Sequence, residues 1–233
     1  MFWSSAKIDS KDVNREIRRI IWPQLKANGF SKFASRNAWR YGSDSIDVIN
    51  LQSFNSYNAS VLGVTTFSFS VNLACYLKYV PPQWPVKEKD GQLIPAEYDG
   101  QFRRHLQSSI PQAGDYKHKQ GIGALDKKGR NLAVSMEDVA QQIPSALAWF
   151  ARLTDKEEVL RILLEDDVDM NELWGFGRNP SPVRSYLAGY VALSLGQEKL
   201  ALAKLGEAVQ SKCFDAQFST VEQALDRAVN VGA

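Results

Sequence analysis

The stretch of sequence that decides the fold is Ser43 to Lys78, SDSIDVINLQSFNSYNASVLGVTTFSFSVNLACYLK. Its last part alternates strictly between apolar side chains and small or polar ones. The apolar positions are Phe67, Phe69, Val71, Leu73, Cys75 and Leu77. This alternation predicts a β-strand with one face in a core and the other toward a polar environment. Ile46 to Phe54 is expected to be its antiparallel partner, with Asn55 to Gly63 as the turn between them.

A helix is predicted ahead of these strands, because apolar side chains recur at helical spacing from Val13 to Leu25. Pro23 lacks a backbone donor and is expected to kink this helix, and Gly29 is expected to end it. A further strand is predicted from Ser35 to Tyr41, before a tight turn.

The segment from Lys78 to Asp115 contains five prolines and is expected to be irregular. One short helix is predicted within it, from Tyr98 to Leu106. A second hairpin is predicted from residues 117–125 and 131–135.

The hydrophobic period changes from two to 3.6 at Ser135, where Asp138 would complete a capping box. Further helix starts are expected at Thr154 and at Ser181 followed by proline. The segment SYLAGYVALSLGQEKLALAKLGEAV reads as one tetratricopeptide-like hairpin around Gly196. The predicted fold class is therefore α+β: an N-terminal helix on an antiparallel sheet of about five strands, then an all-helical C-terminal lobe. The expected domains are residues 1–135 and 136–233.

Charge is distributed unevenly along a chain whose net charge is only +2. Residues 1–40 contain nine Lys or Arg and three acids, whereas residues 155–172 contain eight acids and two basic residues. The small net charge argues against a dedicated nucleic-acid binder. No apolar run reaches the ~20 residues of a membrane span. Two distant cysteines, Cys75 and Cys213, fit a reducing cytoplasm.

Several short motifs resemble a known bacterial family. They are Gly29-Phe30-Ser31-Lys32, Trp39-Arg40, VINLQSF at 48–54, FSFSVNL at 67–73, IGAL at 122–125 and AWFARL at 148–153. Together they resemble the family called domain of unknown function 4304. The family has no established activity, so the resemblance implies a bacterial, cytoplasmic α+β domain and no particular chemistry.

The sequence contains no motif that predicts catalysis, a metal site or a cofactor. His105 and His118 are the only histidines, and with Cys75 they make no zinc-binding spacing. Phosphate-binding loops and the dinucleotide fingerprint do not occur. Polar residues Asn50, Gln52 and Asn72 on the predicted strands are expected to form a polar patch, either as buried groups paired to the backbone or as a ligand pocket.

The favoured function is that of a non-enzymatic protein-interaction domain, for instance an immunity protein that neutralises a basic toxin domain. Its predicted partner-binding residues combine acids with two aromatic side chains. They are Glu165, Asp166, Asp167, Asp169, Glu172, Trp174 and Phe176. The alternative for the two aromatic residues is that they fill the seam between the two lobes.

Two alternative functions remain open at this point. The first is nucleic-acid binding by the leading helix, with candidate phosphate contacts at Arg15, Arg18, Arg19 and Lys26. This binding would be weak and indifferent to sequence, because the stripe lacks aromatic residues for base stacking. The second alternative is an enzyme whose site lies under the 78–115 loop.

Overall fold

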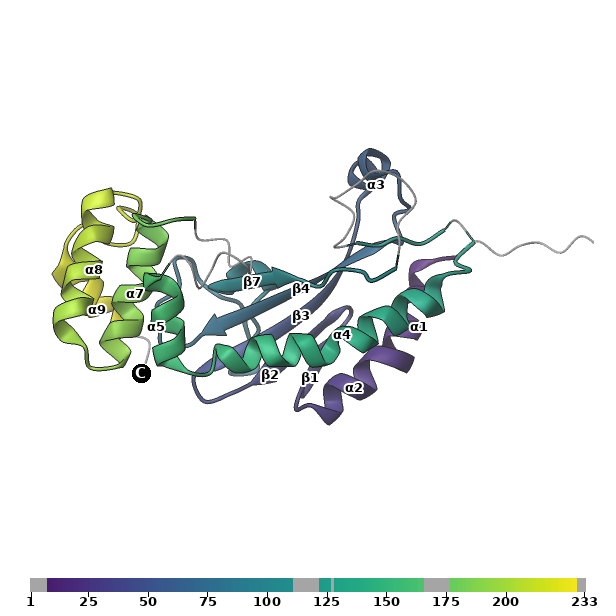
Figure 1. Ribbon diagram of the computed structural model, residues 1–233, viewed down its shortest axis with the longest axis horizontal. Helices are drawn as coiled ribbons and strands as arrows, with labels where there is room; N and C mark the ends of the chain where they lie inside the picture. The colour runs from purple at the N-terminus through teal and green to yellow at the C-terminus, as the bar shows by residue number, and fades with distance from the viewer. Residues whose placement is uncertain (1–7, 111–121, 127, 166–176, 230–233) are drawn as a thin grey trace, which may run out of the picture. The chain divides into compact units, whose positions relative to one another are not determined.

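The computed structural model describes residues 8–110, 122–126, 128–165 and 177–229 (Figure 1). It has an N-terminal helix, a five-strand antiparallel sheet and a C-terminal helical region, which confirms the expected α+β fold class. The helices are α1 (Ser10–Glu16), η1 (Ile17–Ile21), α2 (Trp22–Ala27), α3 (Ser56–Leu62), η2 (Glu97–Asp99), α4 (Leu132–Arg152), α5 (Lys156–Leu164), α7 (Pro182–Ser194), α8 (Glu198–Ser211) and α9 (Val221–Val229). The strands are β1 (Lys32–Ala34), β2 (Asn37–Tyr41), β3 (Ser45–Ser53), β4 (Phe69–Leu77), β5 (Glu88–Lys89), β6 (Gln92–Leu93), β7 (Phe102–His105) and β8 (Ile122–Gly123).

The main sheet has the order β1-β2-β3-β4-β7, and the short strand β8 also pairs with β4. Strands β1 and β2 form an antiparallel hairpin in which Lys32 lies opposite Trp39. In the antiparallel pair β4 and β8, Phe69 lies opposite Gly123. A Cβ atom on Gly123 would lie 2.6 Å from the ring of Phe69, so this close pairing requires glycine.

The chain forms two compact units. Unit 1 consists of residues 1–41, 47–73 and 105–148, and unit 2 consists of residues 42–46, 74–104 and 149–233. Both units contain residues from either side of position 135. The expected division into domains 1–135 and 136–233 stays a prediction.

The leading helix of unit 1 changes its hydrogen-bonding pattern ahead of its proline. Residues 17–21 form a π-helical turn, which ends where the N–H of Trp22 donates to the carbonyl of Ile17. Pro23 follows in the first turn of α2. A proline has no N–H, and its ring clashes with the carbonyl four residues back in an α-helix, so the wider turn accommodates it. Gly29, with a φ of 86°, ends the helix as expected.

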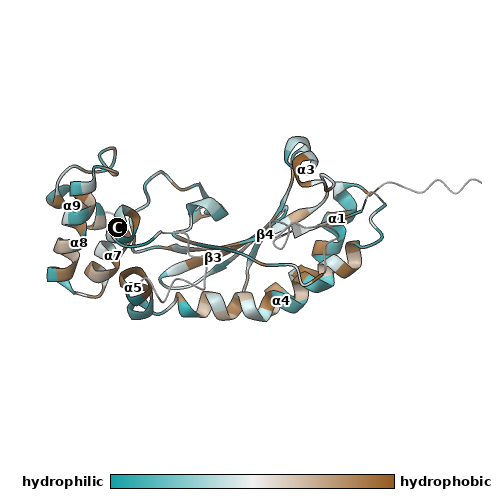
Figure 2. Ribbon diagram, turned by 45° about the horizontal axis from the view of Figure 1, so that its top comes forward, coloured by the Kyte–Doolittle hydropathy of each residue, from teal (hydrophilic) through white to brown (hydrophobic). Residues whose placement is uncertain are grey.

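Helices α1 and α4 of unit 1 lie on the same side of β3 and β4 (Figure 1). Hydrophobic and hydrophilic residues alternate along α4, as an amphipathic helix requires (Figure 2). The buried side chains of this core include Val13, Ile17, Leu25, Ile49, Leu51, Val71, Leu73, Met136, Val139 and Ile143. Burying one such side chain contributes about 1.5–3 kcal/mol.

Unit 2 contains the expected hairpin of two helices, α7 and α8. The turn between them contains Gly196, with a φ of 71°. Gly189 of α7 lets the helices approach closely, because a Cβ there would lie 2.7 Å from the side chain of Leu205 on α8. Gly189 therefore lies where the two helices touch, as the sequence predicted for small residues of this segment, whereas a Cβ on Gly206 would meet nothing within 4 Å.

Two segments differ from the sequence expectation because side chains cap helices there. Residues 55–63, expected to be a turn, contain α3. The Oδ1 of Asn55 accepts the N–H of Asn58, and Gly63 closes the helix with a φ of 64°. Helix α5 is capped by Asp155, whose carboxylate accepts two N–H groups, and not by Thr154.

The second predicted hairpin is wrong in its second strand. Helix α4 begins at Leu132, so residues 131–135 are not a strand. Asn131 explains the change, because its side chain bonds the backbone of Ala124 and Asp126 and closes the turn before the helix. The predicted capping box is also wrong, since Asp138 accepts hydrogen bonds from Ser108 and Ser109 instead.

Residues 98–106 do not form the expected short helix. They contain the end of the 3₁₀ turn η2 and then strand β7. Strand β4, expected to present one open polar face, is buried on both faces from Val71 to Leu77. Within unit 2, the segment at Gly100 accounts for part of the burial of residues 74–77, because Gly100 lies against Ala74.

Candidate functional site

A groove of about 690 Å³ opens on the surface of unit 2. Its lining comes from residues 81–87, from residues 94–103 and from residues 183–187 at the start of α7. The first two stretches belong to the proline-rich segment between β4 and β7 (Figure 1). The volume lies in the range of pockets that hold whole ligands, about 300–1,000 Å³.

The wall formed by residues 81–83 is held by side chains from α7, from α9 and from the turn between α8 and α9. The three backbone carbonyls each accept one hydrogen bond. The hydroxyl of Tyr186 donates to the first, Nη2 of Arg227 donates to the second at 2.6 Å, and Nε2 of Gln217 donates to the third at 3.3 Å. This proline-rich wall therefore has a fixed backbone path, which limits the entropy lost when a ligand binds.

Tyr186 anchors this wall from inside an aromatic cluster. Its ring stacks on Phe214 with a centroid separation of 4.6 Å and meets Tyr190 edge-on at 5.0 Å. Burial raises the pKa of the Tyr186 hydroxyl to about 12. The hydroxyl therefore stays protonated at neutral pH and keeps donating to the carbonyl of Pro81.

The opposite wall is fixed against β4. A Cβ on Gly100 would lie 2.7 Å from Cβ of Ala74, so glycine lets the segment pass over the strand. The Oε1 atom of Gln101 accepts the backbone N–H of Leu77 at 2.7 Å. Both walls are thus held in place by hydrogen bonds and close contacts that involve the backbone.

Exposed hydrophobic side chains gather at this groove. Trp84 and Tyr98 are each 69% exposed, and Val183 is 39% exposed. All three line the groove, although they come from three different stretches of the chain. Apolar surface gathered in this way marks interaction sites, and aromatic residues are enriched at their centres.

The charged lining residues are two cations and one carboxylate. Lys87 and Arg103 are exposed, and neither forms an ion pair with another residue in the described ranges. The carboxylate of Asp99 is already engaged, because its Oδ2 accepts the N–H of Ala96 at 2.7 Å. The groove therefore offers aromatic stacking, apolar contact and pairing with an anion.

The expected polar patch forms on the sheet of unit 1, and His105 joins it. Nδ2 of Asn50 donates to Asn37 at 2.7 Å, while Nδ2 of Asn72 donates to Oδ1 of Asn50 at 3.2 Å and to Oε1 of Gln52 at 2.8 Å. Nδ1 of His105 lies 2.8 Å from Oδ1 of Asn72. Asn72 is only 4% exposed, and its amide group is fully used. The network stabilises a buried amide, but these hydrogen bonds join side chains to one another and not to the backbone as the sequence predicted.

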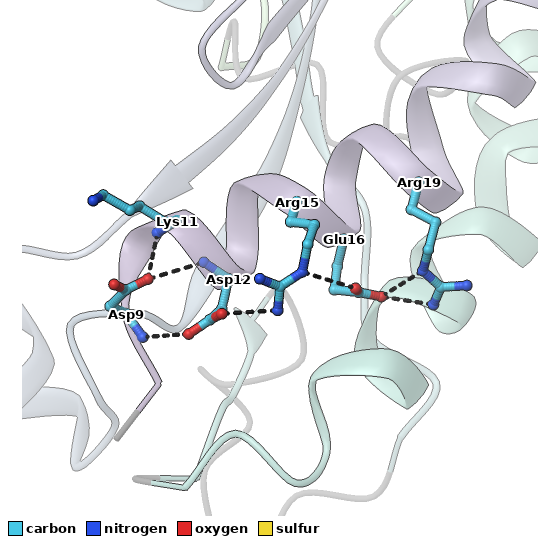
Figure 3. A network of polar contacts seen from close by, with 6 residues as sticks. All are labelled: Asp9, Lys11, Asp12, Arg15, Glu16 and Arg19. Carbon is cyan, nitrogen blue, oxygen red and sulfur yellow. Dashed lines mark hydrogen bonds and ion pairs between the residues drawn. The ribbon is translucent and has the colours of Figure 1, made fainter. Parts of the chain in front are cut away.

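Two of the four candidate phosphate contacts on the leading helix are ion-paired (Figure 3). Nη2 of Arg15 lies 2.8 Å from Asp12, and Nη2 of Arg19 lies 2.6 Å from Glu16. The pKa of the Asp12 carboxyl is lowered, first by the backbone N–H of Asp9 and then by Arg15. These contacts offset part of the positive charge that a phosphate would meet.

The other two predicted phosphate contacts lie together. Arg18 and Lys26 line a hollow of about 350 Å³ with Trp22 and Phe33. The ammonium of Lys26 lies 5.4 Å from the centroid of the Phe33 ring, within cation–π range. Aromatic rings therefore accompany this part of the basic surface, which the sequence reading had not predicted.

Most of the predicted partner-binding residues lie outside the described part of the chain. They are Asp166, Asp167, Asp169, Glu172, Trp174 and Phe176. Glu165 is described, and its carboxylate lies 3.6 Å from Arg161. Glu158 lies between Arg152 at 2.9 Å and Arg161 at 2.7 Å. The described acids of this segment therefore have local partners.

The two arginines beside Glu158 change the pKa of its carboxyl. Burial raises the pKa of its carboxyl, but hydrogen bonds from Arg152 and Arg161 outweigh this effect and lower the pKa below its usual value.

Within the described ranges, no group of three or more histidine, cysteine or acidic side chains is arranged to hold a metal ion. No described helix has the length and hydropathy needed to cross a membrane.

No protein-family model, curated protein or solved structure matches this chain. The resemblance to domain of unknown function 4304 therefore stays an expectation from the sequence.

Proposed function

We propose that this protein acts by binding another protein, through the groove of unit 2. The observation that carries the proposal is the position of Trp84 and Tyr98. Both rings are largely exposed, and both line one groove whose backbone is held by the buried Tyr186 and the half-buried Arg227. Rigid, exposed aromatic residues beside an arginine are typical of the residues that dominate protein–protein affinity.

The groove occupies the place where the sequence suggested an enzyme site, under the 78–115 loop. Its lining favours recognition over chemistry, since the groups it presents are mainly rings, prolines and two cations, and its one carboxylate, Asp99, is bonded to the backbone. Nucleic-acid binding by the leading helix has less support, because Arg15 and Arg19 are paired with acids.

The more specific role is that of a cytoplasmic bacterial immunity protein, which would neutralise a basic toxin domain. It rests on the acidic segment at 155–172 and on electrostatic steering of a basic partner. Coexpression with a toxin encoded beside this gene tests that role, and survival of the cells is the expected result.

The experiment for the proposed function compares two exposed aromatic residues. A partner is first isolated with the tagged full chain and identified, and its Kd is then measured for wild type, Trp84→Ala and Tyr57→Ala. Tyr57 is 76% exposed and lies on α3, outside the groove. The expected Kd rises about 30-fold or more for Trp84→Ala, the effect of losing a hot spot of about 2 kcal/mol. It should change less than about twofold for Tyr57→Ala. Equal Kd values for all three proteins would refute the proposal.

A further inference from the structure

We infer that the groove of unit 2 takes an extended, acidic segment of its protein partner, in which one or more carboxylates lie between apolar residues. The inference rests on the proposed function and adds the chemistry of the occupant. Three features of the groove support it: its shape, its charge and the placement of its aromatic rings.

The shape of the groove favours an inserted segment over contact between flat surfaces. Its volume of about 690 Å³ is bounded on three sides, by residues 81–87, 94–103 and 183–187. Exposed rings stand on two of these sides, Trp84 on the first and Tyr98 on the second. An occupant that contacts both rings must enter the groove with its own side chains. A stretch of extended chain does this with few ordered residues.

The charge of the groove selects an anion. Lys87 and Arg103 line the same groove, are exposed, and form no ion pair within the described part of the chain. Asp99, the lining carboxylate, accepts the N–H of Ala96 with one oxygen and keeps its negative charge. The two cations outnumber this one anion, so the charged lining residues are net positive. A carboxylate on the partner would therefore gain two cationic neighbours, whereas a lysine would meet like charges.

The apolar part of the lining favours apolar residues on either side of the partner's carboxylate. Pro81, Pro85, Val183 and Leu187 present apolar surface beside the two rings. An aliphatic residue or a proline on the partner can bury its surface there, while an unbroken run of acids cannot. The expected ligand therefore alternates apolar and acidic residues.

The test uses three blocked nine-residue peptides of leucine and proline around a central pair of residues. The pair is Glu-Glu, Gln-Gln or Lys-Lys, and Kd is measured for the full chain by calorimetry at low and at physiological salt. The Glu-Glu peptide should bind about fivefold to tenfold tighter than the Gln-Gln peptide at low salt. The difference should shrink as salt screens the exposed charges.

Two charge variants provide the control. Lys87→Gln with Arg103→Gln should abolish the preference for the Glu-Glu peptide. Lys11→Gln with Arg18→Gln makes the same change in net charge on unit 1 and should keep the preference, because both residues lie outside the groove.

Four outcomes would overturn the inference. The first is equal Kd values for the three peptides, and the second is tighter binding of the Lys-Lys peptide than of the Glu-Glu peptide. The third is absence of peptide binding up to millimolar concentration. The fourth is an oligothymidylate that binds tighter than the Glu-Glu peptide and loses this binding in Trp84→Ala. The first two leave the proposed function standing, since that function is judged by the Kd of the whole partner for Trp84→Ala. A Trp84→Ala variant that binds the whole partner normally would instead refute the proposed function itself.

Discussion

The close crossing of α7 and α8 gives opposite stability effects for two glycine substitutions. Gly189 and Gly206 both lie inside helices, one on α7 and one on α8. Alanine is favoured over glycine in a helix interior by about 1 kcal/mol, and this helix preference stabilises Gly189→Ala and Gly206→Ala equally. A Cβ at Gly206 meets nothing within 4 Å. Gly206→Ala should therefore raise the free energy of unfolding by about 1 kcal/mol.

A Cβ at Gly189 meets a packed neighbour instead. It would lie 2.7 Å from Cγ and Cδ2 of Leu205 and 3.2 Å from its backbone nitrogen. Extra atoms in a well-packed core typically cost about 1–3 kcal/mol. Gly189→Ala should therefore be less stable than Gly206→Ala by about 1–3 kcal/mol, since the helix preference cancels between them.

Urea unfolding followed by far-ultraviolet circular dichroism measures this difference. A third variant separates the side-chain clash from the backbone contact. In Gly189→Ala combined with Leu205→Ala, the extra methyl group finds space, so the double variant should be more stable than the sum of the single effects by about 0.5–3 kcal/mol. If Gly189→Ala proves as stable as Gly206→Ala, the helices do not approach as closely as the structure places them.

Three further predictions concern polar groups. Asn72→Ala should lower the free energy of unfolding by about 1–3 kcal/mol in urea titrations, because its amide holds the network on the sheet. Asp155→Ala should cost about 1 kcal/mol through the lost cap of α5, whereas Thr154→Ala should cost less than half of that; equal costs would contradict the cap assignment. The lowered pKa of Glu158 means that its stabilising effect is present at neutral pH and is lost as the pH falls through the folded-state pKa. Stability should therefore decrease below about pH 5, and by less in Glu158→Gln; an identical pH profile for this variant would argue against the effect of Arg152.

The sequence predicted the fold class because its strongest patterns are local. Apolar residues alternate along the strand that ends at Leu77 and recur at helical spacing before Gly29. Each pattern indicates one buried face of its own element. The effect of Pro23 is also local: a π-helical turn precedes it in the chain, at residues 17–21. These signals needed no knowledge of distant parts of the chain.

The errors occurred where a side chain bonds the backbone or where distant segments meet. Asn131 closes a turn with its side chain, so the residues after it begin a helix in place of the predicted strand. The alternation in β4 could not show that Gly100 would lie against its second face.

The sequence suggested a site under the 78–115 loop, but it could not identify the lining residues, because they are scattered over about a hundred residues of sequence. One signal was present: Trp84 stands among prolines in a segment with few other large apolar residues. A tryptophan in such a loop either packs into a core or lies exposed at a binding surface. The sequence does not distinguish these two positions, whereas the 69% exposure of Trp84 in the structure does.

The most direct test of the proposed binding surface is photo-crosslinking in the cells from which the gene comes. A photoreactive phenylalanine derivative replaces Tyr98 in one strain and Tyr57 in another, since both side chains are well exposed but only Tyr98 lines the groove. We expect one protein to be crosslinked at position 98, to be absent at position 57, and to disappear from position 98 when Trp84→Ala is added. Crosslinking that is equal at the two positions, or that persists in the Trp84→Ala background, would contradict the assignment of the groove as the partner-binding site.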